Sequence, residues 1–124
     1  MATIKSFTSL EQSKKLAKFL PLESADMCYP LPCEDGDKPL LEQGGFGSTP
    51  CWSLAALLDV LPNNKHISTT LSRGGWKIEP PEYVDKWWCE YEDDDYTKDF
   101  SVSADNPVDA CYKMIIRLHE LNLL

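Results

Sequence analysis

The feature that most constrains the fold is a run of β-branched and alternating residues between His66 and Ser103, interrupted only by short turn segments. Its links are too short for crossover connections, which need about a dozen residues or more. The run therefore predicts an antiparallel meander of three or four strands. The predicted strands are residues 66–72, 76–79, 83–92 and 97–103, with Arg73-Gly74-Gly75 and Asp93-Asp94-Asp95 as turns.

Three helices are predicted around this meander. The first covers residues 10–20 and ends at Pro21, with Thr8 or Ser9 as its N-cap and Glu11 at capping-box spacing from Thr8. The second covers residues 50–61, with Thr49 as its cap and Pro50 at the first helical position. Its apolar residues cover most of its circumference, which predicts a buried central helix.

The last helix has the clearest pattern. Asn106 precedes Pro107 in the arrangement of a cap and a first helical residue, and apolar residues then recur at spacings of three and four. Between the first and second helices, residues 22–49 are rich in proline, glycine and acids. They predict irregular chain with at most a short extended piece at residues 27–31.

Because the strands cluster between the second and last helices, we expect one α+β domain over residues 1–124. Its architecture is predicted as two layers, with three helices packed on one face of a meander of three or four antiparallel strands. The length and the 43% hydrophobic content fit one ordinary globular domain. The expected core includes Leu57, Leu58, Leu61, Trp87, Tyr91, Ile115 and Leu118.

Charge narrows the possible partners. The net charge is −8, which argues against direct binding to nucleic acid or to an anionic membrane surface. No export signal and no apolar run long enough to span a bilayer are present in the sequence, so we expect a cytoplasmic protein. The five cysteines are then expected to be reduced, mostly buried and not bridged.

Most of the negative charge lies between residues 79 and 99, a segment that contains nine acidic residues and two lysines. This cluster is either a solvated hairpin or an electrostatic recognition surface, and a mimic of nucleic-acid phosphate is one form of the second reading. Neighbouring residues in a strand point to opposite faces. If Trp87 and Tyr91 face the helices, Trp88 therefore lies on the other face, where it is either covered by loop 22–49 or available as a binding anchor.

One alternative is enzymatic. Cys51 follows a glycine-rich loop at the predicted start of the second helix, where the helix dipole would lower the thiol pKa. The run QGGFGSTPCWS resembles the nucleophile segment of papain-like and NlpC/P60-like cysteine hydrolases. That resemblance implies a histidine on the following sheet, and His66 is the position that matches it.

Other chemistry is not indicated. Cys28 and Cys33 lack a second pair at similar spacing, so we predict no metal site and no cofactor. The segments PCWSLAALLDVLP, DNPVDACYKMIIRLHELNLL and LEQSKKLAKFLPLESADM resemble a family of short uncharacterised proteins from anaerobic gut bacteria and their phages or mobile elements. Membership of that family implies a small cytoplasmic accessory protein.

The leading hypothesis is a non-enzymatic protein that binds an unidentified protein partner. The predicted binding residues are Trp88, Glu90, Glu92, Asp93, Asp94 and Asp95. The alternatives are a cysteine hydrolase that uses Cys51 and His66, and an acidic inhibitor that mimics nucleic acid. The oligomeric state does not follow from the sequence.

Overall fold

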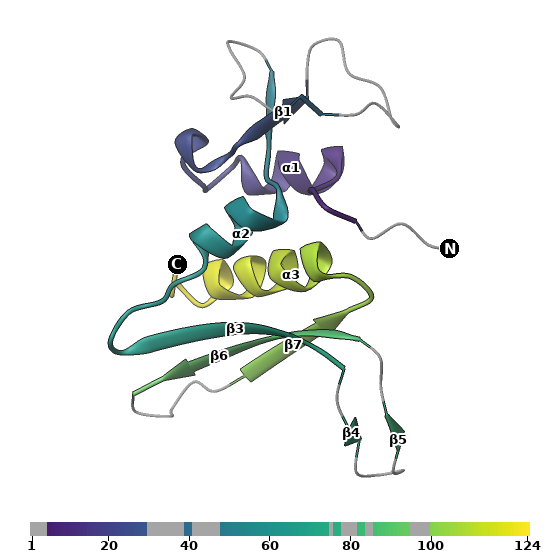
Figure 1. Cartoon of the computed structure of the whole chain (residues 1–124). Helices are drawn as coiled ribbons and strands as arrows, with labels where there is room; N and C mark the ends of the chain where they lie inside the picture. Colours follow the sequence, from purple (N-terminus) through teal and green to yellow (C-terminus); the bar gives the residue numbers. More distant parts are fainter. Residues whose placement is uncertain are drawn as a thin grey trace. The chain divides into compact units, whose positions relative to one another are not determined.

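The computed structural model describes residues 5–29, 39–40, 48–74, 76–77, 82–83, 86–94 and 100–124. It divides into two compact units, Lys5–Val60 and a second unit that contains Leu61–Leu124 (Figure 1). Helices and antiparallel sheets occur together, which confirms a mixed α+β fold. The predicted single domain and the predicted packing of all three helices on one face of the sheet stay predictions.

The first unit begins with helix α1, Leu10–Leu16. Ser9 is its N-cap, as one of the two predicted candidates. Its hydroxyl accepts a hydrogen bond from the Gln12 N–H at 3.2 Å, and the Gln12 side chain accepts one from the Ser9 N–H at 3.0 Å. The predicted pairing of Thr8 with Glu11 is therefore wrong, because Ser9 and Gln12 form the capping box.

The predicted end of this helix at Leu20 is also wrong. The helix ends at Leu16, and Ala17 is its C-cap. The Lys18 and Phe19 N–H groups bond three residues back, to Lys15 and Leu16, so the chain tightens into 3₁₀-type turns before Pro21. A short 3₁₀ helix, η1 at Leu22–Ser24, follows.

Strands β1, Met27–Tyr29, and β2, Thr49–Cys51, form an antiparallel pair in the first unit. The short extended piece predicted at residues 27–31 is confirmed for Met27–Tyr29. Residues 30–38 and 41–47 of the expected irregular loop lie outside the described residues.

The predicted helix start at Thr49 and Pro50 is wrong, because both residues belong to β2. Pro50 faces Cys28, whose own N–H and carbonyl bond to Leu40 on the far side of β1. Cys28 and Pro50 are therefore a pair without mutual hydrogen bonds, and the N–H that proline lacks is not needed there.

Helix α2, Leu54–Val60, begins after Ser53. The Ser53 hydroxyl accepts a hydrogen bond from the Ala56 N–H at 3.2 Å, so Ser53 does the capping that the sequence assigned to Thr49. The Asp26 carboxylate fixes this cap, since it accepts hydrogen bonds from the Ser53 N–H and from the Ser53 hydroxyl. Leu57 and Leu61 are buried as expected, but the predicted burial of Leu58 is wrong, because its side chain is 41% exposed.

The second unit contains a three-stranded antiparallel sheet in the order β3-β6-β7. Its strands are β3 at Ile67–Arg73, β6 at Trp87–Asp93 and β7 at Phe100–Ala104. The predicted pairing of residues 66–72 with residues 76–79 is wrong, because β3 pairs along its whole length with β6. The predicted antiparallel sheet is therefore confirmed, but the connection between its first two strands differs from the predicted one.

The segment between β3 and β6 carries its own small ladder. Strand β4, Trp76–Lys77, pairs with β5, Glu82–Tyr83. Gly74 has a φ of 77°, a left-handed conformation that favours glycine, and its N–H donates to the Lys86 carbonyl at 2.6 Å. Gly74 therefore lies where the chain passes from one ladder to the other, and not in a hairpin turn.

Helix α3, Pro107–Glu120, packs against this sheet (Figure 1). Asn106 caps it by accepting a hydrogen bond from the Asp109 N–H at 2.8 Å, as predicted. Its end is a Schellman motif, in which the Leu123 N–H bonds to the Leu118 carbonyl and Asn122 has a φ of 57°. The side chains that α3 buries are apolar: Pro107, Val108, Ala110, Cys111, Met114, Ile115 and Leu118.

The two adjacent leucines of α2 provide a matched test of the burial pattern. Leu57→Ala should lower the free energy of unfolding by about 2–5 kcal/mol, since Leu57 is fully buried. Leu58→Ala should lower it by less than about 1 kcal/mol, because much of that side chain already contacts water. Urea denaturation of both variants measures the difference, and equal losses would show that α2 is oriented differently.

Candidate functional site

The alternation of β6 determines which side chains the sheet presents away from α3. Cys89 and Tyr91 are buried, Glu90 and Glu92 are exposed, and Trp88 is half-buried. The predicted burial of Trp87 in the core is wrong, because that side chain is also half-buried. Side chains that are two residues apart share a face of a strand, so Trp88, Glu90 and Glu92 point the same way. We call the face that they share the outer face of the sheet.

Small polar residues complete the outer face. In register, Trp88 lies between Ser72 and Ser103, and Glu90 lies between Thr70 and Ser101. Glu92 lies beside Ser68. Trp88 and Glu90 are thus flanked on both sides by short hydroxyl-bearing residues, and Glu92 has such a neighbour on the β3 side. Cross-strand partners project to the same side, so the outer face is a central ridge with low polar margins.

Trp88 carries an unsatisfied group. Its indole Nε1 is buried and has no hydrogen-bond partner among the described residues. A buried donor without a partner costs about 1–3 kcal/mol, which makes the indole position unfavourable for the isolated fold. Such groups are rare in folded proteins and call for an explanation.

The carboxylates on the outer face are not neutralised locally. Neither Glu90 nor Glu92 forms an ion pair with a residue in the described ranges. No lysine or arginine is among the register neighbours of the ridge on β3 and β7. The two negative charges therefore face solvent without a nearby cation from this sheet.

The other predicted binding residues fall elsewhere. Asp93 lies on the same face of β6 as Tyr91 and is half-buried. Burial raises the pKa of Tyr91, and the negative charge of Asp93 raises it further. Asp94 follows β6 and bonds to His66, while Asp95 lies outside the described residues. The structure thus gathers Trp88, Glu90 and Glu92 on one face and separates Asp93 from them.

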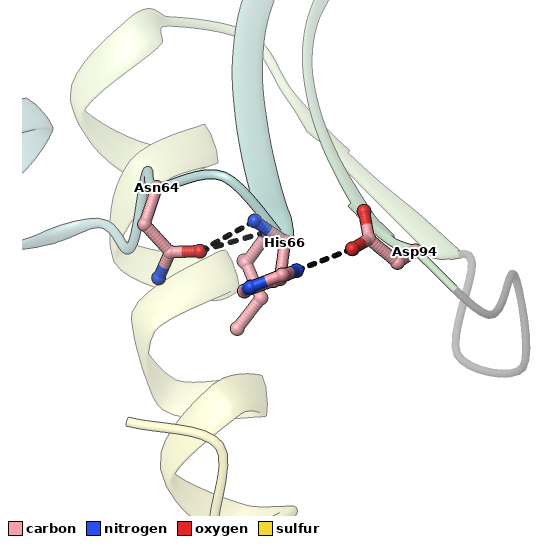
Figure 2. Close-up of polar contacts among 4 residues, drawn as sticks. Asn64, His66 and Asp94 are labelled. Atoms are coloured by element: carbon pink, nitrogen blue, oxygen red, sulfur yellow. Dashed lines mark hydrogen bonds and ion pairs between the residues drawn. The ribbon is translucent and has the colours of Figure 1, made fainter.

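His66 lies at the start of β3, opposite Asp94. Its Nδ1 is 2.5 Å from the Asp94 carboxylate, and its backbone N–H donates to the Asn64 side chain at 2.7 Å (Figure 2). The Ile67 N–H donates to the same Asn64 oxygen at 3.0 Å. Sequence reasoning missed Asp94 as the partner of His66, since their pairing depends on the register of β3 with β6 across 28 positions.

Cys51 lies in a different environment from the one predicted. It ends β2, ahead of α2, so the predicted position in the first turn of a helix is wrong. The thiol is fully buried in a cluster with Met27 and Tyr29. Its sulfur donates to the Thr8 carbonyl at 3.4 Å and lies 3.5 Å from the Thr8 hydroxyl.

Thr8 is the centre of that buried network. Its hydroxyl lies 2.7 Å from the Ser13 hydroxyl and accepts a hydrogen bond from the Trp52 N–H at 3.1 Å. Its carbonyl also accepts the Tyr29 hydroxyl at 2.7 Å. Burial raises the pKa of the Cys51 thiol, and the hydroxyl groups around it offset this effect only in part. The shift is opposite to the one that activates a nucleophilic cysteine.

The hydrolase alternative therefore loses one structural premise, an activated thiol at the start of a helix. The pKa of Cys51 is raised, and Cys51 contacts residues of the first unit, while His66 bonds to residues of the second. A His–Asp hydrogen bond orients an imidazole as a general base requires. Among the described residues, His66 contacts Asn64 and Asp94, and neither supplies a thiol or a hydroxyl group.

Metal ligands do not cluster in the described part of the chain, where no group of three or more His, Cys, Asp or Glu residues could hold an ion. Cys33, which was considered with Cys28, lies outside the described residues. No described helix is long and apolar enough to cross a membrane.

The state of Cys51 can be measured by alkylation. At neutral pH, iodoacetamide should modify Cys51 in the folded protein at least about 100-fold more slowly than in the unfolded chain, because reaction needs local opening of the buried cluster. Peptide mass spectrometry distinguishes Cys51 from the other cysteines. Labelling of the folded protein faster than a model thiol would restore the hydrolase alternative.

The comparisons with known proteins add no relatives. No family model matches the chain, and neither a curated protein nor a solved structure matches it. The resemblance to proteins of gut bacteria and their mobile elements therefore stays a prediction.

Proposed function

We propose that this chain is a small, non-enzymatic accessory protein that binds a protein partner through the outer face of the β3-β6-β7 sheet. Trp88 is the anchor, Glu90 and Glu92 provide charge, and Asp94 lies beyond the end of β6. Tryptophan is among the residues that most often dominate binding energy at protein interfaces.

One observation carries the proposal: a half-buried tryptophan, whose indole N–H has no hydrogen-bond partner among the described residues, shares the outer face with two carboxylates that form no ion pair with a described residue. A purely structural face has no need of either feature. Serine or threonine at position 88 would match its neighbours Ser72 and Ser103 and would not bury a donor without a partner. Binding to a partner gives these side chains a role that folding does not.

The proposed setting is the cytoplasm. The four described cysteines, Cys28, Cys51, Cys89 and Cys111, are all free and buried. Thiols of this kind persist in a reducing compartment. Association with a phage or mobile element of gut bacteria belongs to the same proposal and is supported by the sequence resemblance alone.

The test uses the partner isolated with the full chain from its native host. Trp88→Ala should weaken binding to that partner by about tenfold or more, mainly through faster dissociation. The double variant Glu90→Lys/Glu92→Lys should slow association by about tenfold at low salt and flatten the dependence of the association rate on salt.

Glu11→Lys is the control, since Glu11 is an exposed acid in the first turn of α1 and lies outside the outer face. Surface plasmon resonance at low and high salt measures both rate constants. If Trp88→Ala weakens binding and the double variant does not, recognition depends on the indole and not on the two carboxylates. Binding that neither the Trp88 variant nor the double variant changes, relative to Glu11→Lys, would contradict the proposed function.

A further inference from the structure

Backbone groups at both edges of the β3-β6-β7 sheet are already occupied in part. At the β3 edge, the Thr69 N–H donates to the Asn63 side chain at 3.0 Å, and the Ile67 N–H donates to Asn64. At the β7 edge, the Lys113 ammonium donates to the Ser103 carbonyl at 2.9 Å. A partner strand that extended the sheet would have to displace these contacts. The outer face is therefore the more accessible surface of this sheet.

The ridge on the outer face has a regular spacing. Trp88, Glu90 and Glu92 occupy alternate positions of one strand, so successive side chains are about 7 Å apart. Side chains on one face of any extended polypeptide repeat at the same interval. An extended segment lying along β6 would therefore bring every second side chain over one member of the ridge.

Charge indicates which side chains that segment carries. Glu90 and Glu92 carry like charges about 7 Å apart and therefore repel each other, and no described residue neutralises them. A partner that brings two cations relieves this repulsion and gains two ion pairs. The hydroxyls of Thr70 and Ser101, on either side of Glu90, can accept further hydrogen bonds from a guanidinium or ammonium group.

Trp88 also favours a cationic side chain in the partner. Only serines flank it in register, so no large neighbour on β3 or β7 competes for the space beside its ring. The negative face of an indole ring attracts a guanidinium or ammonium group, more strongly when water is excluded. All three positions of the ridge thus favour a cationic side chain.

We propose that the outer face binds an extended polypeptide segment that carries arginine or lysine at three alternating positions, opposite Trp88, Glu90 and Glu92. This inference rests on the proposed function and specifies its partner. The segment needs at least about five residues to span the ridge, whose ends are roughly 13 Å apart.

The test compares synthetic peptides with the full-length protein. Two fluorescein-labelled peptides have the same composition of arginine and threonine, one with arginines at alternating positions and one with them contiguous. A third replaces the arginines of the alternating peptide with leucine. Fluorescence anisotropy gives each dissociation constant at low and high salt.

The alternating arginine peptide should bind at least about threefold more tightly than its contiguous isomer, since each correctly placed exposed ion pair adds a small gain in affinity. Glu90→Gln/Glu92→Gln should remove that preference and most of the salt dependence, whereas Glu11→Gln should preserve both. Trp88→Ala should weaken binding of the alternating peptide further. Circular dichroism checks that each variant is folded.

Equal affinity for the two arginine isomers would overturn the inference, as would a preference that survives Glu90→Gln/Glu92→Gln. Absence of measurable binding of the alternating arginine peptide would overturn it as well. Binding of the leucine peptide that is lost in Trp88→Ala and independent of salt would overturn the basic partner and leave the proposed function standing. The proposed function itself fails only if binding of the native partner is indifferent to Trp88 and to the ridge carboxylates.

Discussion

The architecture of the second unit depends on the two-sided alternation of β6. Cys89 and Tyr91 are fully buried on the side of α3, where the Cys89 and Cys111 thiols are hydrogen-bonded and the Tyr91 ring stacks on Phe100 at 5.1 Å. A slip of one residue in register would exchange this set for Trp88, Glu90 and Glu92. Burying two carboxylates would cost far more than the sheet could recover. The packing of α3 on the sheet therefore also determines which side chains face the solvent.

Sequence reasoning predicted elements whose signals are local. Asn106 and Pro107 begin α3 as expected, and the β-branched run of β3 is a strand, because in each case capping chemistry or periodicity agrees with the tertiary contacts. Thr49 and Pro50 show the opposite case. They have the pattern of a helix start, but pairing with β1 places them in a strand, in a position where the missing proline N–H is tolerated. Local propensity is overridden there by pairing with residues 20 or more positions away in sequence.

The candidate site also contains features that could be predicted from the sequence and features that could not. The common face of Trp88, Glu90 and Glu92 follows from alternation, which a sequence displays directly. The hydrogen bond between His66 and Asp94 does not, since it requires the register of two strands whose connection was predicted incorrectly. The environment of Cys51 was also beyond local reasoning, because Thr8 and Tyr29 approach it from distant parts of the chain. A Cys-Trp pair after glycines indicates a nucleophile only if a helix begins at that cysteine.

The central claim is that β6 buries Cys89 and Tyr91 and presents Trp88 on its opposite face. Hydroxyl-radical footprinting of the folded protein, read residue by residue and normalised to the unfolded chain, tests this directly because all three side chains react readily. The account predicts strong protection of Cys89 and Tyr91 together with clearly weaker protection of Trp88. Protection of Trp88 equal to or stronger than that of Cys89 and Tyr91 would contradict the assigned faces of the sheet and the proposed binding through its outer face.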